Sequence, residues 1–285
     1  MRKLLLIFTI FAMTYGAFAQ IDSGTIVVFN LTKNKLIVAT DSRAVHDNST
    51  PPDNLYCKIS ALRNQFVFVT LGSASYTREY PSAPIQSWSN TEIAMDAIRS
   101  VTTKGGSSSY LNDVATAWQH SVTERWQALC GTQLRKCRDV VKDTHGIITD
   151  GIFIEAATKT VNGVEITLVE GPSPTLQWKT GMEFSTCSPC FQSRRSKICA
   201  LGDHVDVAVK VCSRKHQNHI KVRTKLPKGM SEDVLLPVSI VESAVDIYDN
   251  GGTGTVGGPV DVLEIDSKGT IRWLAKKPNC PENLD

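Results

Sequence analysis

Three short runs of mostly apolar residues near the start of the chain constrain its fold most strongly. They are residues 25–30, 36–40 and 66–71, and each is continuous rather than alternating with polar residues. β-Branched and aromatic residues dominate these runs, which is typical of strands. Successive side chains of a strand point to opposite faces, so a continuous apolar strand is buried on both faces. The runs therefore predict a sheet that is covered on both sides.

Helical and extended patterns alternate after these strands. Amphipathic helices are predicted from an N-cap within residues 90–92 and over residues 110–129. An antiparallel pair follows from residue 145, with its turn at Gly163. Residues 172–195 have no regular pattern and are predicted to be irregular.

The last third of the chain repeats the change from helix to strand. Ser231 is predicted to cap a helix, and residues 260–265 and 270–274 are predicted to form a final strand pair. No low-complexity linker divides the chain, so a single domain is expected over residues 25–285. The order of elements predicts an α+β fold, a four-layer α/β/β/α sandwich in which helices cover two packed sheets.

The first nineteen residues have the pattern of an export signal. Arg2 and Lys3 are basic, residues 4–13 are apolar but too short to span a bilayer, and Ala17–Ala19 is a small-x-small cleavage site. Residues 1–19 are therefore predicted to be a signal peptide, and the mature protein is expected to be secreted or periplasmic. The alternative is an uncleaved N-terminal anchor, which the cleavage site disfavours.

The charge of the chain gives little reason to expect a strongly charged partner. Loss of Arg2 and Lys3 with the signal peptide would lower the formal net charge from +3 to +1. A protein so close to neutrality has no general electrostatic attraction for nucleic acid or for an anionic membrane. We therefore expect neither partner after signal cleavage.

The chain contains eight cysteines, and an even number in an exported chain indicates disulfides. Cys130 and Cys137 are close enough in sequence to close a small loop at a helix end. Cys187 and Cys190 have the spacing of zinc ligands, but no second pair completes a site. Disulfides are the favoured interpretation, free thiols and zinc remain alternatives, and we predict no metal or cofactor. The other cysteines and nearby histidines are Cys57, Cys199, Cys212, Cys280, His204, His216 and His219.

Four residues in the first strands could together activate a hydroxyl nucleophile. A threonine hydroxyl is a weak nucleophile until a base takes its proton, and if Thr25 were the first residue its own α-amine could be that base. The Lys58 ammonium would favour the neutral amine, and Asp41 would hold Lys58 charged. The backbone N–H of Gly72 could stabilise an oxyanion. The structural alternatives are an ordinary strand threonine, an ion pair and a turn glycine.

This pattern resembles the β-type proteasome subunits and the related bacterial N-terminal nucleophile (Ntn) peptidases. The family has a Gly-Thr self-cleavage junction, an Asp-x-Arg at the end of the second strand, an active-site lysine and an oxyanion glycine. A one-residue insertion in the loop before the lysine puts all four motifs in a single register. The matching residues are Gly24, Thr25, Asp41, Arg43, Lys58 and Gly72.

The resemblance implies an activity and a maturation step. The Thr25 hydroxyl would attack the Gly24 carbonyl, remove residues 20–24 as a short propeptide, and expose Thr25 as the nucleophile of a threonine-type peptidase or amidohydrolase. The substrate would be a peptide or another amide, and the oligomeric state is left open. An amidase for small amides and a catalytically inactive binding or assembly module are the alternatives. Arg43 is expected to support the loop.

The resemblance is weaker near the end of the chain. Residues 256–261 resemble the Gly-Gly turn before the family's last strands, but the supporting aspartate and serine of the family correspond to Thr253 and Val256. A second register uses Asp246 and Asp249 instead. Ser231 is a weak candidate for a further supporting serine of the family.

Overall fold

The structure is a computed structural model of the chain. It describes residues 20–22, 25–44, 56–77, 85–102, 110–132, 137–138, 147–169, 175–180, 189–192, 196–202, 221–248 and 256–285. The predicted signal peptide lies outside the described residues. So does Gly24.

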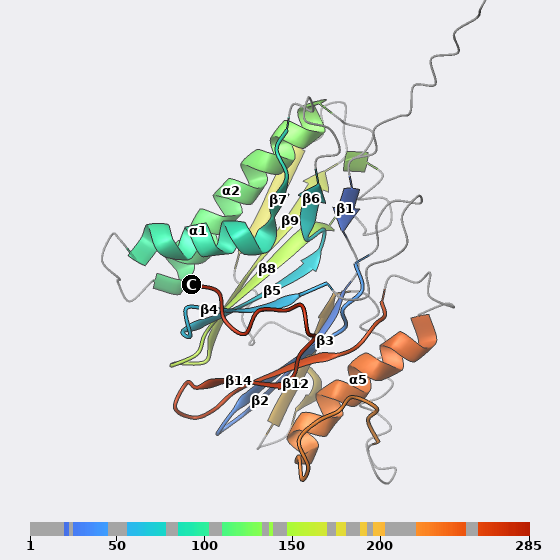
Figure 1. The fold of residues 1–285 in the computed structure, drawn as a ribbon. Coiled ribbons are helices and arrows are strands. Elements are labelled where there is room, and N and C mark those ends of the chain that lie inside the picture. Colours follow the sequence, from blue (N-terminus) through green and yellow to red (C-terminus); the bar gives the residue numbers. More distant parts are fainter. Residues whose placement is uncertain are drawn as a thin grey trace, which may run out of the picture.

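Two antiparallel sheets form the centre of the molecule (Figure 1). The first has six strands in the order β11-β12-β2-β3-β13-β14. Its strands are β11 (Pro189–Gln192), β12 (Ser196–Gly202), β2 (Ile26–Thr32), β3 (Leu36–Thr40), β13 (Asp261–Ile265) and β14 (Ile271–Ala275). The hairpin β2–β3 is central, and strands from the last third of the chain flank it.

The second sheet has five strands in the order β10-β9-β8-β5-β4. Its strands are β10 (Thr175–Thr180), β9 (Thr160–Val169), β8 (Ile147–Glu155), β5 (Phe66–Gly72) and β4 (Ile59–Leu62). A small third sheet has the order β1-β6-β7. It is formed by β1 (Gln20–Asp22), β6 (Ser75–Thr77) and β7 (Trp88–Ser89).

Helices cover the outer faces of the two large sheets (Figure 1). Helices α1 (Asn90–Thr102) and α2 (Tyr110–Thr132) pack on the five-stranded sheet, and α5 (Glu232–Tyr248) packs on the six-stranded sheet. A third apolar cluster lies between the sheets and includes Val27 and Val38 from one and Val67 and Val69 from the other. The predicted α+β fold is confirmed, and the apolar runs are buried because β2, β3 and β5 are covered on both faces.

Local contacts explain two features of the helical layer. Ser89 and Glu92 form a capping box at the start of α1, with backbone-to-side-chain hydrogen bonds of 3.1 and 3.2 Å in the two directions. The cap is therefore one residue earlier than predicted. On α2, Trp118 packs so tightly on Gly151 of β8 that a Cβ there would lie 2.6 Å from the indole ring.

The structure corrects two sequence predictions in the middle of the chain. Gly163 lies inside β9 opposite Ile152, and the turn between β8 and β9 is formed by residues 156–159. Lys159 adopts a positive φ of 55° there, so a non-glycine residue provides the left-handed conformation that we expected of Gly163. The segment 172–195 is not wholly irregular, because it contains β10 and β11.

Two disulfides join described residues. Cys130–Cys137 closes a short loop at the end of α2, as predicted, and Cys57–Cys280 joins positions 223 residues apart. Cys199 is also disulfide-bonded, which removes it from any zinc site. Among the described residues no cluster of metal-ligating side chains is found. Cys187 and Cys212, with the three histidines near them, lie outside the described residues.

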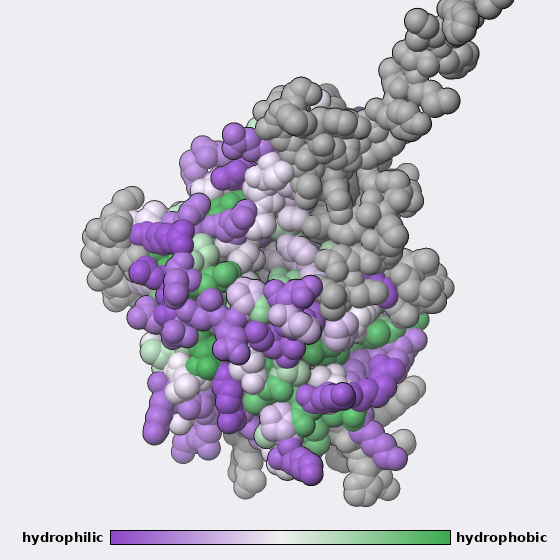
Figure 2. Space-filling model, in the orientation of Figure 1, coloured by the Kyte–Doolittle hydropathy of each residue, from purple (hydrophilic) through white to green (hydrophobic). Residues whose placement is uncertain are grey.

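Hydrophilic and hydrophobic residues are intermixed on the face of the molecule shown in Figure 2. Of the large hydrophobic side chains described, only Ile247 on α5 is largely exposed, at 57%. No helix in the described ranges has the length and apolar character needed to cross a membrane.

Candidate active site

Asp41 and Lys58 form a buried ion pair where a strand of each large sheet ends. The Lys58 Nζ atom lies 3.0 Å from both carboxylate oxygens of Asp41, and the two side chains are 2% and 0% exposed. Asp41 follows the end of β3, and Lys58 precedes the start of β4. The pair therefore links the six-stranded sheet to the five-stranded sheet, and it brings together the two residues that the sequence predicted to meet.

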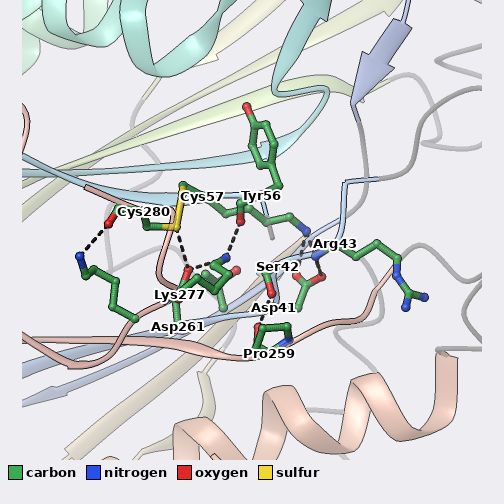
Figure 3. Close-up of polar contacts among 12 residues, drawn as sticks. Asp41, Ser42, Arg43, Tyr56, Cys57, Pro259, Asp261, Lys277 and Cys280 are labelled. Carbon is green, nitrogen blue, oxygen red and sulfur yellow. Dashed lines mark hydrogen bonds and ion pairs between the residues drawn. A yellow bond between two sulfur atoms is a disulfide. The ribbon is translucent and has the colours of Figure 1, made fainter. Parts of the chain in front are cut away.

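Three backbone N–H groups also donate to the Asp41 carboxylate. Ile26 donates to Oδ1 at 3.0 Å, and Arg43 and Gly257 donate to Oδ2 at 3.2 and 3.1 Å. Hydrogen bonds to a carboxylate fix its orientation. Figure 3 shows Asp41 at the centre of this group, between the chain around Ser42 and the chain around Pro259. Asp41 thus holds Lys58 in a fixed place.

The chain after Asp41 is fastened to the turn that precedes β13. The Ser42 N–H donates to the Gly257 carbonyl at 3.1 Å, and the Ser42 hydroxyl donates to the Pro259 carbonyl. The Arg43 guanidinium covers Gly257 so closely that a Cβ on that residue would lie 2.3 Å from Cζ. Arg43 is 2% exposed, so this contact is part of the interior. Any larger residue at position 257 would have to displace this buried guanidinium.

Thr25 lies directly before β2 and is buried, with 2% of its surface exposed. The next residue, Ile26, donates its N–H to Asp41, so Thr25 is one residue away from the ion pair. Its carbonyl oxygen faces Gly202, where a Cβ would lie 2.3 Å from that oxygen and 2.8 Å from Leu71 Cδ2. Gly202 therefore brings the Thr25 backbone close to the end of β5.

Gly72 ends β5 with a φ of +67°, and a Cβ there would lie 2.8 Å from the Ile148 carbonyl oxygen. Both features require glycine for structural reasons alone. Two residues earlier, the Thr70 N–H donates to the Lys58 carbonyl at 3.1 Å. Gly72 and Lys58 thus lie at the same end of the neighbouring strands β5 and β4. The oxyanion role of Gly72 stays a prediction.

The additional supporting residues of the family have no clear counterpart in the part of the chain that the structure describes. Val256 is fully buried in the apolar cluster under α5. Asp246 lies on the exposed side of α5 and pairs with Arg223 at 2.7 Å. Ser231 contacts Lys35 in the turn between β2 and β3, at the opposite end of this hairpin from Thr25. Thr253 and Asp249 lie outside the described residues.

A second buried lysine–aspartate contact lies beside the first, and our reading of the sequence missed it. Lys277 Nζ is 2.5 Å from Asp261 Oδ2, and both side chains are almost fully buried. Burial raises the pKa of Asp261 above its ordinary value of 3.8; Lys277 opposes this change, and the nearby charge of Asp41 adds to it. Asp261 pairs with Thr40 across β13 and β3, which places it next to Asp41. No motif in the sequence signals this contact.

The resemblance to the proteasome-like Ntn hydrolases implies a threonine before a central strand, beside a buried lysine–aspartate pair between two packed sheets. Thr25, Lys58 and Asp41 have this arrangement.

Among solved structures, the chain has matches to Anbu from Hyphomicrobium sp. strain MC1. A mutant of Anbu matches with 14% identity and a TM-score of 0.43, covering 90% of this chain and 89% of that one. A second Anbu structure matches with 12% identity and a TM-score of 0.42, covering 90% and 88%.

At this low identity and TM-score the likeness assigns no role to any residue. No protein-family model matches the sequence, and no curated protein matches it.

Proposed function

We propose that the chain is an exported Ntn hydrolase with the four-layer α/β/β/α fold, in which Thr25 becomes the N-terminal nucleophile and cleaves amide bonds. The buried contact between Asp41 and Lys58 carries this proposal. It lies close to Thr25 in the chain, because Asp41 also accepts a hydrogen bond from the N–H of Ile26, the residue after Thr25. The geometry agrees with a hydrolase and does not distinguish a peptide from another amide as the substrate.

Asp41 and Lys58 supply what a terminal threonine needs. The α-amine of an N-terminal residue has a pKa of about 8, close to the value at which a general base works best near neutrality. A lysine ammonium nearby favours the neutral amine, which can then take the proton of the Thr25 hydroxyl. The five hydrogen bonds that Asp41 accepts keep this lysine in place.

Self-cleavage would generate the nucleophile. The Thr25 Oγ attacks the carbonyl carbon of Gly24, the C–N bond to Thr25 breaks, and the hydroxyl proton passes to the departing amine. Water then hydrolyses the resulting ester to give a free Gly24 carboxylate and a Thr25 that carries both its hydroxyl and its amine. In substrate cleavage the same hydroxyl attacks the amide, and the Gly72 N–H stabilises the developing oxyanion.

The residues before Thr25 have a suitable position for a leader that is removed later. Gln20–Asp22 form β1, which pairs with β6, and β6 begins three residues after Gly72. In the uncleaved chain Thr25 is buried, so a substrate reaches it only after this leader has left. The signal pattern of residues 1–19 supports a location in the periplasm or outside the cell.

A catalytically inactive module is the second candidate function. The observation that favours it is Val256, an apolar residue within the core at the place where the family has a supporting serine. If the supporting polar groups are needed to orient the amine, the fold would persist with a binding or assembly role and the Gly24–Thr25 bond would remain intact.

Intact-mass measurement of the wild type and of Thr25→Ala distinguishes the two functions. The wild type is expected to show a terminus at Thr25 and to react with a peptide epoxyketone, an electrophile for N-terminal threonines, whereas Thr25→Ala keeps its leader and does not react. Thr25→Ser retains a hydroxyl and serves as the matched control that should still be cleaved. A wild type with Gln20 as its sole mature terminus would contradict the proposal.

A further inference from the structure

The C-terminal segment, residues 276–285, joins the edges of the two large sheets. It leaves β14 at the edge of the six-stranded sheet and reaches β4 at the edge of the five-stranded sheet (Figure 1). The Leu284 N–H donates to the Ala61 carbonyl at 2.9 Å, and the Arg63 N–H donates to the Leu284 carbonyl at 2.7 Å. This segment therefore adds backbone hydrogen bonds to the strand that begins directly after Lys58.

The same segment is fastened to the two residues before Lys58. Cys280 forms a disulfide with Cys57, the residue that precedes Lys58. The Lys277 ammonium donates to the Tyr56 carbonyl and also contacts Asp261 (Figure 3). One covalent bond and one buried cation thus fix the backbone from which Lys58 projects.

Such fastening matters because Lys58 is desolvated. A buried ion pair offsets the loss of water only when its geometry is maintained. Lys58 reaches Asp41 across the interface between the two sheets. Within the described residues, the strand that follows Lys58, β4, has only β5 as a neighbouring strand. Without the C-terminal segment, the chain around Tyr56 and Cys57 would lose its covalent anchor and its contact with Lys277.

We propose that the Cys57–Cys280 disulfide is an oxidation-dependent lock that positions Lys58, so that the site becomes competent only after this bond has formed. This inference rests on the proposed function. Cys57, Cys280 and Lys277 are positioning residues, since they act through the placement of Lys58. Cys130–Cys137 lies at the end of α2, in the apolar cluster under α1 and α2 and on different elements from these groups.

The lock closes by thiol–disulfide exchange. The thiolate of one cysteine attacks a disulfide oxidant, the second cysteine displaces the oxidant from the mixed disulfide, and the oxidant leaves as two thiols with the two electrons and two protons. In a thiol-reducing compartment the chain would remain reduced and its Gly24–Thr25 bond uncleaved. Cleavage would follow arrival in an oxidising compartment, which agrees with the predicted export signal.

The test compares three forms of the full chain: wild type, Cys57→Ala/Cys280→Ala, and the matched control Cys130→Ala/Cys137→Ala. Each is refolded with reduced glutathione or with a glutathione redox buffer. The fraction of chains that begin at Thr25 is followed by intact mass. Oxidised wild type and the control are expected to mature fully, whereas reduced wild type and the Cys57→Ala/Cys280→Ala variant mature only to a small extent. Wild type recovers when oxidised glutathione is added.

The kinetics of labelling separate positioning from loss of folding. For the small fraction of Cys57→Ala/Cys280→Ala that matures, the rate constant kinact for a peptide epoxyketone is expected to fall by about tenfold to a hundredfold. KI should stay within about twofold, because only the reacting groups are misplaced. Ile98 is a buried residue of α1, and Ile98→Ala would leave a cavity in the core beneath this helix. This variant controls for lost stability: it should change the folded fraction but not kinact.

Titration of the wild type keeps the test decisive even if the double variant does not fold. Labelling is measured across glutathione buffers of increasing potential, while alkylation and peptide mapping report each disulfide. Labelling should follow Cys57–Cys280 and not Cys130–Cys137. Wild-type labelling that persists when Cys57–Cys280 is reduced, or equal kinact in the double variant, would overturn the lock and leave the proposed hydrolase intact. An oxidised wild type that neither matures nor labels would refute both.

Discussion

Replacing Asp41 with asparagine should strongly destabilise the protein, for two separable reasons. Removing one partner of a buried ion pair costs about 3–5 kcal/mol, because Lys58 is left as a buried charge without a counterion. The asparagine NH₂ must also occupy one of the two oxygen positions, each of which now accepts at least one backbone N–H in addition to Lys58. Leaving a buried backbone N–H unpaired costs about 1–3 kcal/mol more.

A double-mutant cycle separates these two contributions. In Asp41→Asn/Lys58→Met the buried charge is absent, so the variant should recover the ion-pair part of the loss and remain destabilised by only about 1–3 kcal/mol. The assay is urea-induced unfolding at pH 7, with midpoints and slopes fitted for all members of the cycle.

A less buried lysine with longer contacts to two carboxylates provides the control. Lys35 lies 3.9 Å from both Asp233 and Glu264 and is 21% exposed. Lys35→Met should therefore change the free energy of unfolding by less than about 1 kcal/mol. The reasoning would be refuted if Asp41→Asn cost no more than Lys35→Met, or if the double variant were less stable than Asp41→Asn alone.

Three further predictions concern the surroundings of the site. Gly257→Ala should lower the free energy of unfolding by about 1–3 kcal/mol because its Cβ would overlap the buried Arg43 guanidinium, and an unchanged urea midpoint would contradict this. Burial raises the pKa of Asp261, so the folded state binds the proton of this carboxyl more tightly than the unfolded chain does. The resulting stabilisation of the folded state is complete below pH 3.8 and is lost as the pH rises through the folded pKa. Wild type should therefore lose stability relative to Asp261→Asn as the pH is raised from 3.8 to neutrality, and a pH-independent difference in urea midpoints would count against the raised pKa. Removal of Cys57–Cys280 should cost up to about 5 kcal/mol and removal of the short disulfide at the end of α2 about 2.5 kcal/mol, because the longer loop constrains the unfolded chain more. Equal thermal midpoints for the two disulfide variants would contradict this ranking.

The part of the site that could be predicted from the sequence is its local part. Asp41 follows a recognisable apolar strand, and the pairing of Asp41 with Lys58 was expected from the chemistry that a terminal threonine needs. The β2–β3 hairpin and β5 could also be predicted, since continuous apolar runs are strong signals of buried strands. These elements depend on neighbours along the chain, which the sequence displays directly.

The contacts that could not be predicted are the distant ones. Cys57 and Cys280 are 223 residues apart, and cysteine counts do not reveal connectivity. Asp261 and Lys277 lie on ordinary-looking segments of the last strand pair, where nothing in the spacing indicates that both side chains are buried. Gly163 was misread because a glycine between two strands usually marks the turn, whereas here Lys159 supplies the left-handed residue instead.

The position of the C-terminal segment has a consequence for synthesis on the ribosome. Thr25, Asp41 and Lys58 emerge early, but Gly257, Asp261 and Cys280, which complete their surroundings, emerge more than 190 residues after Lys58. Chains fold as they are made, and contacts of such large sequence separation form late. A nascent or truncated chain therefore carries the threonine without the groups that secure its lysine. Under the proposed function, the order in which the residues are made would prevent self-cleavage during translation.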